Sequence, residues 1–526
     1  MTPSPLPPNR RVSLLRRLPA AMLSGLLLFL AAPGEHAFPL LAWVGLVPLL
    51  LALAGTPPRQ AAGLGLACGL AFYLPLIHWI VIVLATYGQV ALPLALAALL
   101  FLACYMAGYT TLFALLCRLL TQRFPLVLVA PALWVALDWV RGWLFTGFPW
   151  LDLGYTQYTT PTLLQAADLA GHHGLTFLIV LANALLASLI TAPRRGRISC
   201  PPPACWLAAL LLVLAFLYGS QRQETIAGQL TGQPQLQTAI VQGNIPQDQK
   251  WLPAFQQETV ATYLRLSSQA MTASPPGLVV WPETAMPFYP YEHPLFLRIG
   301  TELTRPYQTF LLAGAPHRAP REDSLEPVYS NSAFLVSPDG VVTGRYDKQH
   351  LVPFGEYVPL RAILSFASPV VQTMGDFSSG QPSPPLACQN GRIGVLICYE
   401  AIFPELARQH AENGANLLVN ITNDAWFGRS GAPWQHLAMS VLRAVETRKS
   451  LVRAANTGIS CFVDPLGRIT APSGLFSEYA RAEAVVLLEE TSWHVRLGHR
   501  FPVACLGLAA ALLLAAATNK RRHPLQ

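Results

Sequence analysis

The chain has 526 residues, of which 53% are hydrophobic and 12% are charged, and its mean hydropathy is +0.40. Soluble globular proteins carry roughly 25% charged residues, so this composition excludes a chain that is soluble throughout. The net charge of +8 comes largely from arginines beside apolar segments. It therefore indicates membrane topology and gives no reason to expect a nucleic-acid partner.

Apolar runs of the length that crosses a hydrocarbon core, about 17 to 25 residues, occur along the first 220 residues and once near the end. We expect about eight spans: Leu18–Ala32, Phe38–Ala54, Ala62–Leu84, Pro93–Leu120, Leu126–Leu144, Leu175–Ala192, Cys205–Tyr218 and Leu497–Ala517. The first and seventh are short. We predict membrane helices 1–7 in residues 1–220, a water-facing domain in 221–495, and a last helix with a tail in 496–526.

Arginine and lysine gather on one side of these spans. With eight spans, the clusters at 10–17, 194–197 and 520–522 all fall on the same side. By the positive-inside rule both termini are cytoplasmic and residues 221–495 lie outside. A cleaved signal peptide is the alternative for the first run, but Pro33–Gly34 leads directly into another span.

The water-facing domain alternates strand and helix patterns, which predicts a layered α/β fold. The strand patterns are Leu236–Gln242, Gly277–Trp281, Thr309–Ala313, Ser332–Val336, Arg392–Ile397, Ala415–Ile421, Leu451–Ala455 and Ala484–Leu488. Helical spacing occurs in Ile402–Glu412 and Trp434–Lys449.

The stretch Leu360–Met374 is apolar, yet too short to span a membrane. It is either part of the core or an exposed arm that enters lipid, and attachment of the domain to a bilayer at both ends favours the arm. The candidate substrate-arm residues are Leu360, Phe366, Trp426 and Phe427.

Cys398 follows a strand pattern and precedes a helical one. A nucleophile on such a turn is exposed, and the next backbone N–H can point at an oxyanion. A packed apolar cysteine and a Cys388–Cys398 disulfide are the alternatives. With Cys461 the domain has three cysteines, so at least one is expected to be unpaired.

Two further residues fit the same chemistry. Glu283 ends a strand pattern next to tryptophan and proline, where partial desolvation suits a general base. Lys348 is one of four lysines in the chain, and its neighbourhood is rich in rigid residues and turn formers. A surface lysine needs no such frame.

The segments W-P-E around Glu283, K-x-H-L-V-P-F-G-E from Lys348 and I-C-Y-E around Cys398 resemble the nitrilase superfamily. With the flanking spans, the whole chain resembles the apolipoprotein N-acyltransferase family. This resemblance implies a nitrilase-like four-layer αββα sandwich beside a polytopic helical membrane domain.

The resemblance also implies roles for these residues. Glu283 would take the thiol proton, Cys398 would attack an acyl ester, and Lys348 with a backbone N–H would stabilise the oxyanion. The supporting residues would be Glu356, Tyr399, Glu400 and Trp251. We expect His350 and His436 to be satisfied polar residues.

The implied reaction moves an acyl chain from a membrane phospholipid, through a cysteine thioester, to the N-terminal amine of a diacylglyceryl-cysteine apolipoprotein. We expect no cofactor, no metal and a monomer in the bacterial inner membrane, with the catalytic domain in the periplasm. The alternatives are a membrane-tethered nitrilase-type amidase and a non-enzymatic transporter or scaffold.

Overall fold

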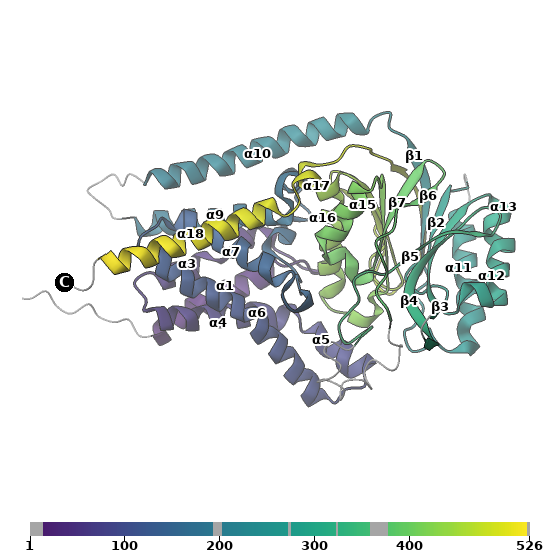
Figure 1. Ribbon diagram of the computed structural model, residues 1–526, viewed down its shortest axis with the longest axis horizontal. Helices are drawn as coiled ribbons and strands as arrows, with labels where there is room; N and C mark the ends of the chain where they lie inside the picture. Colours follow the sequence, from purple (N-terminus) through teal and green to yellow (C-terminus); the bar gives the residue numbers. More distant parts are fainter. Residues whose placement is uncertain (1–13, 193–201, 272–274, 322–323, 358–376, 523–526) are drawn as a thin grey trace, which may run out of the picture.

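A computed structural model describes residues 14–192, 202–271, 275–321, 324–357 and 377–522 (Figure 1). A helical part comes first, an α/β part follows, and the chain returns to the helices through α18 (Arg500–Arg522). The predicted arm, with Leu360 and Phe366, lies outside the described residues.

Five helices of the described chain are long and apolar enough to cross a membrane. They are α1 (Leu14–Ala31), α6 (Leu92–Leu120), α9 (Ala167–Thr191), α10 (Pro203–Leu230) and α18. A sixth results if α4 (Pro58–Leu76) and the helical segment Trp79–Tyr87, bent by 49°, form one span.

The number of described helices long enough to cross a membrane is thus lower than the eight spans predicted, because two of the predicted runs form shorter helices. Residues 39–53 divide into η1 (Pro39–Leu41), α2 (Ala42–Gly45) and α3 (Val47–Leu53), with a proline in the first turn of η1 and of α3. Proline fits the first turn of a new helix and interrupts a continuing one. The other short helix, α7 (Leu126–Arg141), has 16 residues.

The α/β part contains two six-stranded sheets. The first has the order β12-β1-β2-β3-β4-β5 and the second β11-β10-β9-β8-β7-β6. Parallel pairs form the centre of each sheet, and antiparallel strands form the edges. The strands are β1 (Gln235–Gln242), β2 (Leu278–Val280), β3 (Phe310–Arg321), β4 (Ser324–Val336), β5 (Val342–Asp347), β6 (Leu386–Cys388), β7 (Gly391–Ile397), β8 (Leu417–Thr422), β9 (Ser450–Ala455), β10 (Cys461–Val463), β11 (Ile469–Thr470) and β12 (Tyr479–Val486).

The two sheets pack face to face, because their central strands are apolar on both faces. Alternate residues such as Ile240, Val280 and Val395 meet between the sheets. The opposite face of the first sheet, including Val241 and Val279, packs with α11 (Gln256–Ala270) and α12 (Pro294–Ile299). Figure 1 shows these two helices on the side away from the membrane helices.

The second sheet is covered on its other face by α15 (Pro404–Glu412) and α16 (Ala432–Thr447). The layers therefore run α-β-β-α, which confirms the predicted fold class. The strands predicted from sequence are present, whereas the sequence analysis missed the short or edge strands β5, β6, β10 and β11.

Helix α16 lies between the second sheet and the membrane helices (Figure 1). Its apolar residues join one continuous core with residues of α4, α6 and α9. Of its 16 residues only Trp434 is not buried. The two parts of the molecule thus share a packed interface through this helix.

Candidate active site

Cys398 begins the turn η9 (Cys398–Ile402) that follows β7. Its φ of +53° lies in the left-handed region, which few non-glycine residues adopt. Two contacts hold this turn in place. Glu400 accepts a hydrogen bond from the N–H of Ile397 (2.7 Å), and His436 Nε2 lies 3.0 Å from the main-chain oxygen of Cys398.

Glu283, Lys348 and Glu356 form one buried cluster from two separate segments, since Lys348 and Glu356 belong to the same loop after β5. Lys348 Nζ lies 2.9 Å from Glu356 Oε1 and 3.6 Å from Glu283 Oε1. Asn331 Nδ2 donates to the same two oxygens at 2.8 Å each, and the N–H of Asn423 donates to Glu283 Oε2 at 3.0 Å. Both oxygens of Glu283 are therefore held, and the carboxylate has a single orientation.

The electrostatics keep the Lys348 ammonium charged and the Cys398 thiol protonated. Burial alone lowers the pKa of Lys348, but the carboxylates of Glu356 and Glu283 outweigh it, so the net shift is upward. Burial and the charge of Glu283 raise the pKa of Cys398 to about 12, while Lys348 acts in the opposite direction. Attack by this sulfur therefore needs a group that removes its proton.

Glu400 ties the cysteine turn to the segment that carries Lys348. Its Oε1 accepts from the N–H of Gln349 (2.6 Å), the N–H of His350 (3.1 Å) and the hydroxyl of Tyr346 (3.0 Å). The carboxylate is fully buried, and burial raises its pKa to about 7 against the effect of these donors. Of the predicted supporting residues, Glu356 thus contacts Lys348 directly, and Glu400 contacts the residues that precede and follow it in the chain.

The other predicted site residues are more dispersed. Trp251 is 39% exposed and lines a cleft of about 360 Å³ with Phe288 and Tyr289. Phe427 packs on two aromatic residues of the helical part, Trp79 and Trp150, and Trp426 packs on Tyr87 (ring centroids 4.9, 5.8 and 5.5 Å). Trp426 and Phe427 therefore contact the membrane helices.

Two residues of the cluster were not predicted from sequence: Asn331 and Lys250. Asn331 lies on β4 between Ser330 and Ser332, so the local sequence pattern gave no signal that set it apart. Lys250 Nζ donates to the main-chain oxygen of Glu283 at 2.8 Å. The scarcity of lysine that drew attention to Lys348 applied equally to Lys250.

The three cysteines of the α/β part, Cys388, Cys398 and Cys461, are free thiols. The alternative of a Cys388–Cys398 disulfide is therefore wrong for this structure. Cys388 and Cys461 are fully buried among apolar residues of the two sheets. Cys398 is the one of these three that is partly exposed as a residue.

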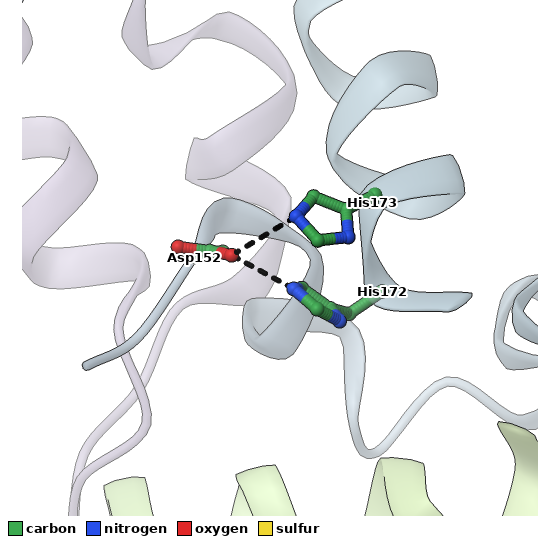
Figure 2. A group of neighbouring side chains, drawn as sticks. All are labelled: Asp152, His172 and His173. Atoms are coloured by element: carbon green, nitrogen blue, oxygen red, sulfur yellow. Dashed lines mark hydrogen bonds and ion pairs between the residues drawn. The ribbon is translucent and has the colours of Figure 1, made fainter. Parts of the chain in front are cut away.

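A second ionisable cluster lies where the membrane helices meet α16. Asp152, His172 and His173 place three possible metal-ligand atoms within 4.8 Å of one another (Figure 2). However, His172 has a carboxylate at each ring nitrogen, Asp152 at 2.8 Å and Glu446 at 3.2 Å, and Arg141 pairs with the other oxygen of Asp152. A metal needs a free imidazole lone pair, so this donor set fits an ion-pair network between the two parts better than a metal site.

These features define a class: a carbon–nitrogen hydrolase-type αββα domain, with a cysteine, a lysine and two glutamates at its centre, packed on membrane helices. A family profile described as carbon-nitrogen hydrolase matches residues 237–487, and one described as apolipoprotein N-acyltransferase N-terminal domain matches residues 24–185. Both profiles agree with the boundary between helical and α/β parts.

Relatives extend the match to nearly the whole chain. The apolipoprotein N-acyltransferase of Geobacter metallireducens is 45% identical over 505 residues, 96% of each chain, and that of Azotobacter vinelandii is 38% identical over 74% of this chain and 72% of its own. A solved structure of Saccharomyces cerevisiae Nit3, a nitrilase-superfamily member, is 21% identical over 49% of this chain and 92% of its own, with a TM-score of 0.38.

This chain belongs to the apolipoprotein N-acyltransferase family and is a membrane-bound acyltransferase.

Proposed function

We propose that this protein transfers an acyl chain from a membrane phospholipid to the N-terminal amine of a diacylglyceryl-cysteine apolipoprotein, through a thioester on Cys398. The observation that carries the proposal is the convergence of Glu283, Lys348 and Cys398 in a domain packed on membrane helices. A thiol beside a carboxylate and an ammonium group suits two-step acyl transfer. Both substrates are lipid-anchored, and a membrane-attached site brings them together.

In the first step Cys398 Sγ attacks the ester carbonyl while Glu283 takes the thiol proton. The S–C bond forms, the ester C–O bond breaks, and the proton passes to the oxygen of the departing lysophospholipid. Lys348 and the N–H of Tyr399 stabilise the tetrahedral oxyanion. Glu356, 2.9 Å from Lys348, orients that ammonium group.

In the second step the amine nitrogen of the acceptor attacks the thioester carbonyl. The amide C–N bond forms, the C–S bond breaks, and the proton from the amine passes through Glu283 to the thiolate. Glu400 keeps the cysteine turn and the lysine segment in register, and Trp251 lines the approach to the site. We place the α/β domain in the periplasm and both termini in the cytoplasm, because the basic residues flank the spans on one side.

The test is the intact mass of the purified protein after incubation with a defined phospholipid. We expect an acyl-sized adduct that hydroxylamine removes, that is absent in Cys398→Ser, and that persists in Cys104→Ser, where an exposed cysteine is replaced. Addition of a diacylglyceryl peptide should then discharge the adduct into an amide. Absence of the adduct from folded protein contradicts the proposal, and discharge to water at the same rate with and without the peptide favours the amidase alternative.

A further inference from the structure

Lys250 is a buried cation that the two steps above do not use. It lies in the loop after β1, directly before Trp251, and is 1% exposed. Its Nζ donates a 2.8 Å hydrogen bond to the main-chain oxygen of Glu283. A lysine this far from water needs a specific role to offset its desolvation.

The two carboxylates that face Lys348, Glu283 and Glu356, are balanced by two cations only when Lys250 is included, whereas Glu400, whose pKa burial raises to about 7, accepts from main-chain N–H groups. Glu283 and Glu356 contribute two carboxylates, and Lys348, 3.6 and 2.9 Å from them, supplies one positive charge. The nearby Asp424 is paired with Arg453 at 2.7 Å. Among the described residues, Lys250 is therefore the second cation that faces the Glu283–Cys398 pair.

The bond from Lys250 also holds a strained turn. Thr284, the residue after Glu283, has a φ of +53°. Gly314 packs so closely beneath this turn that a Cβ there would lie 2.6 Å from the Cα of Glu283. The carbonyl to which Lys250 donates thus belongs to a strained and tightly packed turn. We expect loss of the Lys250 hydrogen bond to change this turn and with it the position of the Glu283 carboxylate.

We propose that Lys250 is a positioning residue of the acyl-transfer site, which fixes the Glu283 turn and supplies the second positive charge that balances the two carboxylates as the thiolate forms. This inference rests on the proposed function of Cys398 as the nucleophile. The proton balance of the reaction is unchanged, because Lys250 keeps its proton throughout. It acts through Glu283 and does not touch the acyl group.

The ionisation of Lys250 provides a readout for this role. Burial lowers its pKa to about 8, and the charges of Glu283 and Cys398 limit the decrease. The ammonium is thus present below about pH 8 and is lost above it. The influence of Lys250 on Cys398 should disappear over the same pH range, while Lys348, whose pKa is raised, stays charged.

The test measures the rate at which iodoacetamide alkylates Cys398 from pH 6 to 10, followed by mass spectrometry of the Cys398 peptide. The variants are Lys250→Met and, as a matched control, Lys449→Met. Lys449 is also 1% exposed, also has its pKa lowered to about 8 by burial, and donates to the carbonyls of Leu488, Glu489 and Glu490. It therefore reproduces the burial and the capping of carbonyls without facing Cys398.

We expect wild type to react about tenfold faster than Lys250→Met at pH 7, the effect of about one unit in the pKa of the thiol. The ratio of the two rates should fall towards one above pH 9, and the Lys449→Met ratio should stay at one throughout. Lys250→Gln keeps a donor for the carbonyl and removes the charge. It should fold even where Lys250→Met does not, and should still react slowly.

A wild-type to Lys250→Gln ratio of one at pH 7, or equal losses in the Lys250 and Lys449 variants, would overturn the inference. Alkylation requires no phospholipid, so this experiment stands apart from the acyl-adduct test. If the protein forms no acyl adduct but the ratio of alkylation rates depends on pH as expected, the proposed function is contradicted and the electrostatic role of Lys250 is supported.

Discussion

The ion pair between Asp168 and Arg448 predicts how strongly the membrane helices stabilise the α/β domain. Asp168 lies on α9, Arg448 follows α16, and both are fully buried. The carboxylate accepts from Arg448 at 2.7 and 3.1 Å, from Arg222 at 2.7 Å and from Tyr218 at 2.6 Å. Arg222 has a second partner in Glu490, so Asp168→Ala leaves Arg448 as the uncompensated charge.

Removal of one partner from a buried pair costs about 3 to 5 kcal/mol. With a urea dependence of about 3 kcal/mol per molar, the upper end of the usual range, this loss lowers the unfolding midpoint by about 1 to 1.7 M. The measurement is a urea titration of the detergent-solubilised protein followed by tryptophan fluorescence. The matched control is Glu478→Ala, which breaks the pair with Arg265 at 2.8 Å, where both side chains are nearly half exposed.

An exposed pair contributes about 0 to 1 kcal/mol, so the control should shift the midpoint by less than about 0.3 M at the same urea dependence. The double variant Asp168→Ala with Arg448→Met removes the unpaired charge and should recover more than half of the loss. A midpoint for Asp168→Ala within the range of the control, or a double variant no more stable than the single one, would refute the reasoning.

Three other outcomes follow from the site and its interface. Glu356→Gln should slow formation of the acyl adduct roughly 100-fold in single-turnover experiments, with phospholipid binding little changed, because the partner 2.9 Å from Lys348 loses its negative charge. An unchanged rate would contradict the role of Glu356. Glu283→Gln should speed alkylation of Cys398 at pH 9, since Glu283 raises the pKa of that thiol, and yet abolish acylation. Slower alkylation would show that the charge of Glu283 does not raise the pKa of Cys398. Residues 221–495 expressed alone should aggregate, because Arg443, Glu446 and Arg448 lose partners on the membrane helices; a monomeric, cooperatively unfolding fragment would show that the interface is dispensable.

Local patterns put Cys398 and Glu283 at the ends of strands, and the resemblance to a known family supplied the roles proposed for them and for Lys348. The β7 pattern ends at Cys398 and the β2 pattern ends just before Glu283, so both side chains fall at the carboxyl ends of parallel strands. The sequence did not show that Asn331 bonds to both Glu283 and Glu356. Asn331 lies on β4, Glu283 follows β2 and Glu356 lies in the loop after β5, so the contact depends on the folded sheet. The same is true of Lys250, whose partner is a main-chain oxygen.

The face of α16 that does not meet the sheet illustrates a more general limit. Apolar Leu437, Val441 and Val445 at helical spacing predicted an amphipathic helix, and a polar opposite face normally indicates solvent. Here Arg443 and Glu446 are buried against Tyr155 and His172 of the helical part. Periodicity distinguishes polar from apolar faces, but it cannot distinguish water from a polar surface of the same protein.

This interface connects the turn of the proposed nucleophile to the membrane helices through α16. His436 lies on α16, contacts the main-chain oxygen of Cys398 at 3.0 Å, and packs near Trp150 of the helical part (ring centroids 6.3 Å). Trp150 also donates to Gln435 at 2.7 Å. One helix therefore holds the cysteine turn on one side and the membrane helices on the other. Because α16 is buried between the two parts, the cysteine turn is held at a fixed position relative to the membrane helices.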